Sequence, residues 1–547
     1  MEKLRSFGAD SAYVLPFSEA RSRRGVTNTN SGVAVGLFRG RSDSTIVIGG
    51  HIDSAGREIP GANDDASGTA TMLELARVWS TRPRRYTMLF VAFSGEEQGL
   101  IGSKYFVEHY PKIDHVALML QIDMVGSEDD LILFLETQKH EAPRWLVEDA
   151  FAFERTLGFQ MLRYPTHFFS LNQALGGAGS DHMPFLDKGI PAMDFTAGVN
   201  NSPIHTPEDK FEFISKTVMD KSGRLIDSML QKYQGQGIPA ARQGDYVLWQ
   251  ALGGRLFIPS WLVSATSGVA VLLGIWAFFF SRKRRLSVER TERVRFSGFK
   301  LFAFIILIAG AAQAGEAAMQ AIKGLRYPWL VHVDKYLWLA GLCTLAGIWV
   351  ALQLTRRWRF SPDPYVYSKR AVLLLLLFVF LLAAASLRLA VYPALTLLLL
   401  SLAIFVPSPL VKALLAILAP LPMFRLMFME VLPFLFRNAI ASGFGILNFA
   451  SALLYTAALT AVLVLWFMPA IFTYAYAVVT VGPLKDALKT VRAPAVGLLL
   501  LLGVVGYGGY LFSFPAYNDM WRAMIHVDAT FDANTGESSL KLVGNEY

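Results

Sequence analysis

The chain has 547 residues, of which 53% are hydrophobic and 17% charged, and its formal net charge is +8. This length exceeds one ordinary domain, and the charged fraction is below the roughly 25% of soluble proteins, so we expect at least two domains, one of them in lipid. The basic residues cluster in short loops between apolar runs and carry no nucleic-acid motif, so we expect no nucleic-acid partner. The single cysteine, Cys343, excludes an intrachain disulfide and a thiolate metal site.

Strand-like and helix-like segments alternate in the first part of the chain. Val33–Phe38 and Thr45–Gly50 are predicted strands, and Thr69–Trp79 is a predicted helix because its apolar residues recur near helical spacing. Tyr86–Phe93 and Val116–Ile122 are near-continuous apolar runs, which are typical of central strands covered on both faces. The alternation predicts an α/β domain with a mostly parallel sheet and helices on both faces.

The composition changes after this domain, which we place at residues 1–235. A polar stretch with Gly and Pro predicts a linker at residues 236–256, and long apolar runs then fill residues 257–514. Because a bilayer crossing needs about 20 apolar residues, we predict an all-α transmembrane domain of about eight helices. The candidate spans are Phe257–Phe280, Leu301–Ile322, Tyr336–Leu354, Ala371–Leu387, Val391–Val406, Leu410–Phe436, Phe444–Met468 and Ala495–Phe514. Prolines between Leu410 and Val481 also allow a re-entrant or broken helix.

The tail at residues 515–547 is polar. Met524–Phe531 and Ser538–Val543 flank Asn534-Thr535-Gly536, a pattern that predicts a β-hairpin. A lone hairpin is barely stable, so we expect it to pack on something outside the bilayer.

Two histidines and several carboxylates stand at predicted strand ends or in loops. In chain order they are His51, Asp53, Asp64, Glu96, Glu97, Asp123 and His205. Ligands bind at the carboxyl ends of strands in open parallel sheets. Catalytic zinc takes His nitrogen and carboxylate oxygen, and a carboxylate can bridge two metals about 3.5–4 Å apart. The set therefore fits a two-metal site.

Neighbouring positions in this set allow different roles. The side chains of Glu96 and Glu97 point in different directions, so one can hold metal while the other acts as general base. Asp53 lies two residues from His51 and can orient its imidazole. Each motif alone also has a structural explanation, such as a surface turn or a helix N-cap. The combination at strand ends is what favours the metal site.

Six stretches in roughly the first 230 residues carry a family resemblance. They are GGHIDS (49–54), PGANDDASG (60–68), FSGEEQGLIGS (93–103), LQIDMVG (120–126), GSDHMPF (179–185) and IHTPED (204–209). With them the chain resembles metallopeptidase family 28 of clan MH, which includes bacterial leucine aminopeptidases, glutamate carboxypeptidase-like enzymes and glutaminyl cyclases. The resemblance implies a zinc exopeptidase fold and two Zn²⁺ per chain.

The resemblance also assigns roles by matching positions. It implies that His51 and Asp123 hold one zinc ion and that Glu97 and His205 hold the other. Asp64 would bridge the two ions, Glu96 would be the general base and Asp53 would support His51. The implied reaction is metal-assisted hydrolysis of peptide substrates by an activated water.

Some assignments stay open at this stage. An aminopeptidase is favoured over a carboxypeptidase, and a glutaminyl cyclase or a catalytically silent binding or transport protein are the alternatives. Asn63 replaces a commonly acidic residue but is not a ligand position. Ser180-Asp181-His182 either lines the substrate pocket or holds a turn. Manganese or cobalt would also suit mixed nitrogen and oxygen ligands.

Basic clusters predict the orientation of an integral multi-pass membrane protein. Arg282–Arg285, residues 356–370 and residues 485–492 fall on one side if there are eight spans. Because short basic loops stay in the cytoplasm, the peptidase domain is predicted to be extracytoplasmic or lumenal. Met1–Gly8 resembles the end of a helix and no signal peptide is present, so we expect the N-terminal end to be truncated. The layout is then similar to that of endoplasmic-reticulum metallopeptidases, with the oligomeric state open.

Four charged residues fall in or near the predicted spans: Glu316, Arg425, Glu430 and Arg437. Charge is costly there and often functional. Contacts with neighbouring helices or with the interface are the structural alternative.

Overall fold

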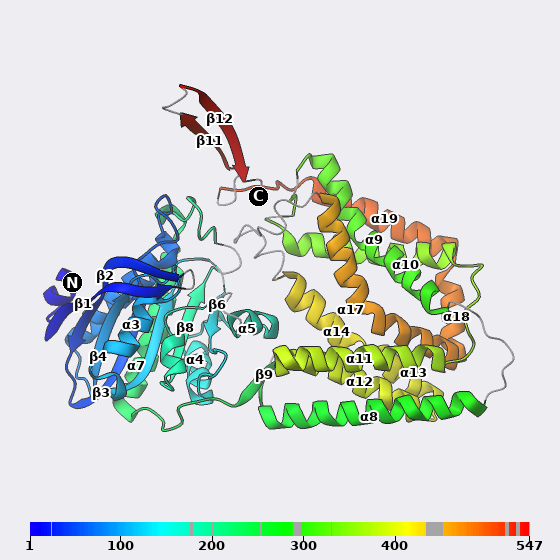
Figure 1. Cartoon of the computed structure of the whole chain (residues 1–547), viewed down its shortest axis with the longest axis horizontal. Helices are drawn as coiled ribbons and strands as arrows, with labels where there is room; N and C mark the ends of the chain where they lie inside the picture. Colours follow the sequence, from blue (N-terminus) through cyan, green and yellow to red (C-terminus); the bar gives the residue numbers. More distant parts are fainter. Residues whose placement is uncertain are drawn as a thin grey trace. The chain divides into compact units, whose positions relative to one another are not determined.

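The computed structural model divides the chain into two compact units, Met1–Ser260 and Trp261–Tyr547 (Figure 1). The structure describes all residues except 23–24, 129, 175–178, 199–201, 252–253, 288–296, 326, 330, 434–451, 520–523, 532–535 and 546–547.

A mixed sheet forms the centre of the N-terminal unit. Within the described residues it has eight strands in the order β1-β2-β4-β3-β5-β8-β6-β7. The neighbours β4, β3, β5 and β8 run parallel, whereas β2 is antiparallel to β4 and β6 is antiparallel to β8. The strands are β1 (Ser11–Ser22), β2 (Gly25–Phe38), β3 (Ser42–His51), β4 (Tyr86–Phe93), β5 (Val116–Asp123), β6 (Leu131–Phe134), β7 (Leu162–Arg163) and β8 (Ala192–Ala197).

Helices cover both faces of this sheet, as the sequence predicts. On one face α2 packs across β3, β4 and β5 and against α7. On the other face the ring of Phe93 contacts Phe106 of α3 and Phe185 of α6. Ile46, Val47 and Ile48 of β3 are consequently all fully buried. The helices of the unit are α1 (Glu2–Ser6), α2 (Gly68–Ser80), α3 (Ile101–His109), α4 (Arg144–Thr156), α5 (His167–Ala174), α6 (Met183–Asp187) and α7 (Lys216–Gln236).

The edges of the unit differ from the sequence prediction. The predicted strand Val33–Phe38 is the second half of a longer hairpin of β1 and β2. Residues 236–256, where a linker is predicted, contain β9 (Tyr246–Ala251), which pairs with β10 (Gly254–Pro259). Tyr246 and Leu248 join the apolar core of the N-terminal unit. The first part of the predicted linker is polar, but the strand that follows it is apolar and belongs to the N-terminal unit.

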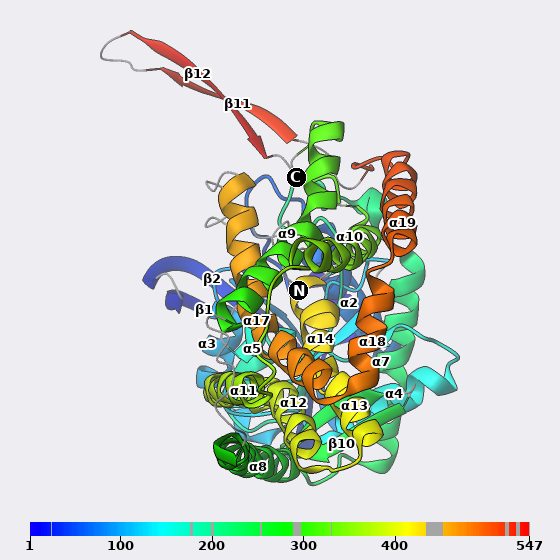
Figure 2. The ribbon, with the colours of Figure 1, turned by 90° about the vertical axis from the view of Figure 1, so that its right-hand side faces the viewer.

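The C-terminal unit is helical and ends in a hairpin. The helices are α8 (Ser260–Ser287), α9 (Ser297–Lys323), α10 (Val333–Leu354), α11 (Tyr365–Ala385), α12 (Leu387–Phe405), α13 (Pro409–Leu418), α14 (Leu421–Arg425), η4 (Leu426–Val431), α17 (Ala452–Thr480), α18 (Gly482–Val491) and α19 (Pro494–Phe512). The hairpin consists of β11 (Met524–Phe531) and β12 (Ser538–Asn545). In both views α17 lies between the α9–α10–α19 group and the α11–α12–α13 group (Figures 1 and 2).

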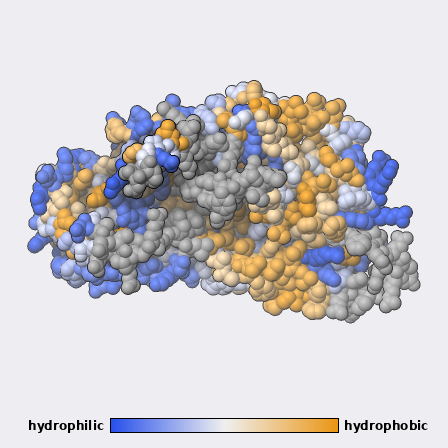
Figure 3. All heavy atoms as spheres, turned by 45° about the horizontal axis from the view of Figure 1, so that its top comes forward, coloured by the Kyte–Doolittle hydropathy of each residue, from blue (hydrophilic) through white to orange (hydrophobic). Residues whose placement is uncertain are grey.

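Eight helical segments in the described part of the chain are long and apolar enough to cross a membrane. Large apolar side chains lie on the outside of the unit, and Figure 3 shows them gathered over its helices. The segment Pro409–Val431 is broken after Leu418, where Pro420 and Pro422 follow, so it is not one continuous α-helix. The predicted span Phe444–Met468 falls partly outside the described residues, and α17 continues beyond its predicted end to Thr480.

The centre of the sheet should dominate the stability of the N-terminal unit. Ile48→Ala removes a fully buried side chain from β3 and should lower the opening free energy of the β3 and β5 amides by about 2–5 kcal/mol. Hydrogen exchange read by mass spectrometry on the full chain measures it. Val14→Ala on β1, where the side chain is 49% exposed, is the control and should change it by less than about 0.5 kcal/mol. Equal effects would contradict this assignment of the core.

Candidate metal centre

Three parallel strands bring the predicted ligands to one edge of the sheet. His51 is the last residue of β3 and Asp123 is the last residue of β5. Glu96 and Glu97 follow β4 after Gly95, whose φ of 74° suits glycine in this sharp turn. Because β3 lies between β4 and β5, the carboxyl ends of the three strands are adjacent.

The carboxylate of Asp64 lies between the two histidines. Its Oδ1 is 3.0 Å from Nε2 of His51, and its Oδ2 is 3.0 Å from Nε2 of His205. Each histidine also meets a second carboxylate. The Nε2 atom of His51 is 3.5 Å from Oδ1 of Asp123, and that of His205 is 3.1 Å from Oε2 of Glu97. The other four predicted metal ligands therefore converge around the carboxylate of Asp64.

The donors fit metal ions in kind and in arrangement. Two groups each have ligating atoms within 4.8 Å of one another: His51 with Asp65 and Asp123, and Asp64 with Glu97 and His205. Among the described residues, the buried atoms Oε1 of Glu97 and Oδ1 of Asp123 have no hydrogen-bond donor. Buried carboxylate oxygens without donors are costly unless a cation neutralises them. Imidazole and carboxylate are the ligands of hydrolytic zinc, so the residues fit a zinc pair.

Exposure differs between the two halves of the site. The side chain of His51 is 1% exposed, whereas that of His205 is 43% exposed. His205 also has a φ of 61°, a left-handed conformation that is uncommon outside glycine. A ligand therefore approaches from the His205 side.

Asp65 and Asp209 hold the backbone of the site, and the sequence analysis gave neither of them a role. The Asp209 carboxylate accepts the N–H groups of Asn63 at 2.8 Å and Asp64 at 3.1 Å. Asp65 accepts the N–H groups of His51 at 2.9 Å and Gly68 at 2.9 Å, and that of the residue after Asp123 at 3.0 Å. Both residues are acidic neighbours of predicted ligands in the motifs NDDASG and IHTPED, and this is the sequence feature that could have identified them. The sequence alone does not show which backbone N–H groups their carboxylates accept.

Asp53 contacts His51 in a way that the sequence could not specify. The Nδ1 atom of His51 is 3.0 Å from the backbone carbonyl oxygen of Asp53 and 3.7 Å from its Oδ1. The Asp53 carboxylate instead accepts the N–H groups of Glu96 at 3.1 Å and Glu97 at 3.2 Å. One residue thus orients the imidazole through its main chain and fixes the Glu96–Glu97 turn through its side chain.

Negative charge and burial raise several carboxyl pKa values in the site. Burial, followed by the charges of Asp181, Asp123 and Glu97, raises the pKa of Glu96 well above its usual value, against a lowering by His51. Burial raises the pKa of Asp181 to about 7. A raised pKa suits a carboxylate that must accept and return a proton near neutral pH.

The Ser180-Asp181-His182 motif is fully buried. Both carboxylate oxygens of Asp181 and both ring nitrogens of His182 lack hydrogen-bond partners among the described residues. Burial lowers the pKa of His182 to about 3, so its ring is neutral. Within this motif, Asp181 acts electrostatically on Glu96.

Known proteins resemble the N-terminal unit. Residues 33–230 match Peptidase family M28. Aminopeptidase YwaD of Bacillus subtilis is 32% identical over 212 residues, which are 37% of this chain and 44% of that protein. A probable zinc metalloprotease of Pyricularia oryzae is 42% identical over 93 residues, which are 16% of this chain and 18% of that protein. This chain therefore spans less than half the length of these curated relatives.

Two solved structures are similar in the same region. A zinc aminopeptidase from Bacillus subtilis is 28% identical, with a TM-score of 0.33, and covers 40% of this chain and 55% of its own. A glutaminyl cyclase of Porphyromonas gingivalis is 22% identical, with a TM-score of 0.36, and covers 42% of this chain and 86% of its own. The N-terminal unit itself is an α/β domain built on a mixed, mostly parallel sheet. Residues 33–230 therefore resemble peptidase family M28, and the helical region that follows has eight apolar helices in its described part.

Zinc binding to the chelator-treated protein should release protons. Burial lowers the pKa of His205, but hydrogen bonds and charges of Asp64 and Glu97 outweigh it and raise that pKa to about 10. His205 therefore carries a proton at neutral pH, below its raised pKa, and zinc must displace it, so apparent affinity should rise between about pH 6 and pH 8. Calorimetry in buffers of different ionisation enthalpy counts the protons. A binding enthalpy independent of the buffer would contradict the linkage, and His205→Ala should lower the count.

Proposed function

We propose that this chain is a membrane-bound zinc metallopeptidase that hydrolyses peptide bonds, most simply as an aminopeptidase. The observation that carries the proposal is the position of Asp64 between His51 and His205, each of which meets a second carboxylate. A purely structural cluster has no need of two histidines on opposite oxygens of one buried carboxylate. The M28 family match over residues 33–230 supports the same conclusion.

Two zinc ions are proposed, and each would be held by one histidine and by the carboxylate that this histidine contacts. His51 and Asp123 would hold one ion, His205 and Glu97 the other, and Asp64 both. Bound zinc would lower the pKa of a water and polarise the substrate carbonyl.

Glu96 is the proposed general base. It stands beside the ligand Glu97, and the Asp53 carboxylate fixes the backbone of both residues. Its raised pKa fits a group that takes the proton of the attacking water and passes it to the leaving amine. Asp181, held without hydrogen-bond partners in the described part of the chain, adds negative charge that keeps this pKa high.

The helical unit is proposed to place the peptidase domain outside the cytoplasm. Lys300 donates to the carbonyl of Arg359, and Gln353 donates to the carbonyl of Arg492, so the start of α9 and the ends of α10 and α18 lie together. These ends carry the basic clusters, which favour the cytoplasmic side. The peptidase domain precedes the start of α8, whereas the end of α8 leads into α9 on the side of the basic clusters. This arrangement supports an extracytoplasmic or lumenal position of the peptidase domain.

Replacing the proposed base should abolish catalysis and leave the metal in place. Glu96→Gln keeps the shape of the side chain but cannot accept a proton, so kcat should fall about 10²–10⁴-fold on a peptide library. Glu74→Gln, an exposed carboxyl on α2, is the matched control and should keep full activity. Unchanged turnover in Glu96→Gln would refute the assignment and favour a binding or transport role. Pyroglutamate formation from N-terminal glutamine peptides, with no hydrolysis, would instead identify a cyclase.

The proposed metal count can be tested without any substrate. Elemental analysis of the purified chain should find about two zinc ions, because His51 with Asp123 and His205 with Glu97 lie at opposite oxygens of Asp64. His205→Ala should reduce this number toward one, and chelation should remove both ions together with activity. His109→Ala on α3 has an exposed histidine outside the site and serves as the control. One ion in the unaltered chain, with full activity, would contradict the two-zinc proposal.

A further inference from the structure

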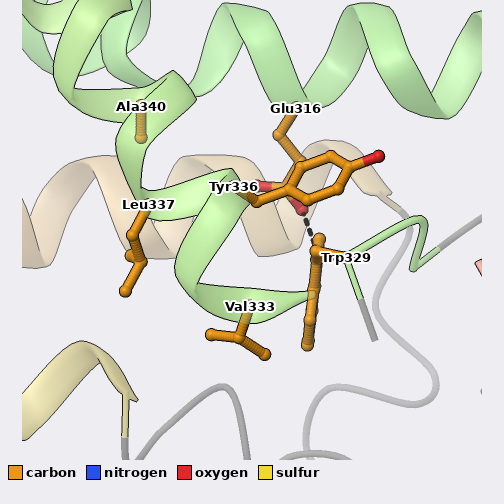
Figure 4. Close-up of a pocket in the computed structure, with 6 residues that line it drawn as sticks. All are labelled: Glu316, Trp329, Val333, Tyr336, Leu337 and Ala340. Atoms are coloured by element: carbon orange, nitrogen blue, oxygen red, sulfur yellow. Dashed lines mark hydrogen bonds between the residues drawn. The ribbon is translucent and has the colours of Figure 1, made fainter. Parts of the chain in front are cut away.

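A small cavity lies in the helical unit, where α9 and α10 approach the segment that joins them. Its volume is about 40 Å³, and its walls are Glu316 of α9, Trp329 of the joining segment, and Val333, Tyr336, Leu337 and Ala340 of α10 (Figure 4). One water needs roughly 10–15 Å³ of such space, so the cavity has room for about three water-sized groups.

A single carboxylate supplies the charge of this cavity. Oε1 of Glu316 accepts the indole N–H of Trp329 at 2.8 Å and the side-chain amide of Gln320 at 3.2 Å. Among the described residues no donor reaches Oε2. Both neutral donors orient the carboxylate without neutralising its charge, so it remains available to a cation.

Two aromatic side chains lie beside this carboxylate in the wall of the cavity. Figure 4 shows the ring of Tyr336 and the indole of Trp329 beside the carboxyl group of Glu316. The Tyr336 hydroxyl is buried and has no partner in the described part of the chain. Val333, Leu337 and Ala340 are apolar. A carboxylate with aromatic faces attracts cations, and organic cations above all.

The cavity selects among cations by size and by donor number. A bare divalent metal needs several oxygen ligands, and this cavity offers one carboxylate and one hydroxyl. A trimethylammonium group exceeds the space of about three small groups. A primary ammonium with its first methylene fits, because its N–H groups can reach Glu316 while the methylene faces the aromatic rings and the apolar wall (Figure 4).

From this geometry we infer that the cavity at Glu316, Trp329 and Tyr336 binds the primary ammonium group of an amine. Two sources share this chemistry: the ethanolamine headgroup of a phospholipid and a free amine. Lys323 is the last residue of α9 and Lys335 lies in the first turn of α10. The phosphate of a lipid headgroup, which follows its ammonium group, would lie near these two lysines. The site is separate from the proposed peptidase centre and does not depend on its activity.

Lipid retention by the full chain tests the inference. The purified protein is delipidated, offered equal amounts of phosphatidylethanolamine, phosphatidylcholine and phosphatidylglycerol, and analysed by native mass spectrometry. The unaltered chain should retain phosphatidylethanolamine roughly tenfold over phosphatidylcholine. Glu316→Gln, which removes the charge and keeps the shape, should lose that preference. Glu430→Gln is the matched control, because Glu430 is another buried carboxyl of the helical unit and accepts the hydroxyl of Tyr392.

Competition with free ethanolamine separates the two sources and needs no variant. Displacement of bound phosphatidylethanolamine supports the ammonium as the recognised group, and binding of ethanolamine alone identifies a soluble amine as the source. Equal retention of choline and ethanolamine lipids, or an unchanged preference in Glu316→Gln, overturns the inference. An unchanged thermal unfolding midpoint of the helical unit in detergent shows that Glu316→Gln is folded. If it does not fold, Trp329→Leu, which removes the aromatic face, must lose the preference instead.

Discussion

The sharing of one buried carboxylate by two histidines is the constraint on which the site depends. Asp64 offers one oxygen to His51 and the other to His205, at 3.0 Å each. This arrangement requires the end of β3, the turn before α2 and a loop about 140 residues later to meet within a few ångströms. Asp209 secures the junction, because it takes the backbone N–H groups that precede and include Asp64. Gly68 is needed for the same reason, since a Cβ there would collide with the carbonyl oxygen of Ile122 and the side chain of Asp65.

The electrostatics of the centre make sense only with cations. Asp65 and Asp194 are fully buried near Asp123, and burial together with that negative charge raises both of their pKa values well above the usual range. The two histidines are the cationic side chains that face the cluster, and both have raised pKa values because the surrounding carboxylates outweigh their burial. Divalent ions held by these ligands would neutralise the carboxylates, whose burial as charged groups is otherwise costly.

Local sequence predicted the residues that converge in the site, but not the residues that hold its backbone in place. The apolar runs ending at Phe93 and Ile122 are strands because both faces are covered, and the ligands follow them in chain order. The β1–β2 hairpin and the strand at Tyr246 were missed: each pairs with the segment that follows it, and the strand at Tyr246 is buried by a core formed mostly of distant residues, which short-range periodicity does not reveal. Asp53 was expected beside His51, where its backbone carbonyl lies, but the sequence did not show that its carboxylate accepts the backbone N–H groups of Glu96 and Glu97. Acceptor choices of this kind depend on tertiary distances of a few tenths of an ångström, which no residue pattern contains.

The helical unit is larger than an anchor requires. One apolar helix holds a domain at a bilayer, whereas eight candidate spans are present in the described residues alone. Helices in lipid gain little from burying apolar surface against one another, so polar groups kept between them must be matched by contacts or by a ligand. Glu430 is matched by the Tyr392 hydroxyl inside the unit. Within the described part of the chain, Glu316 meets two neutral donors and a cavity. The contrast between the two carboxylates argues that the helices near Glu316 are built around something that binds there, and that the unit contributes recognition as well as attachment.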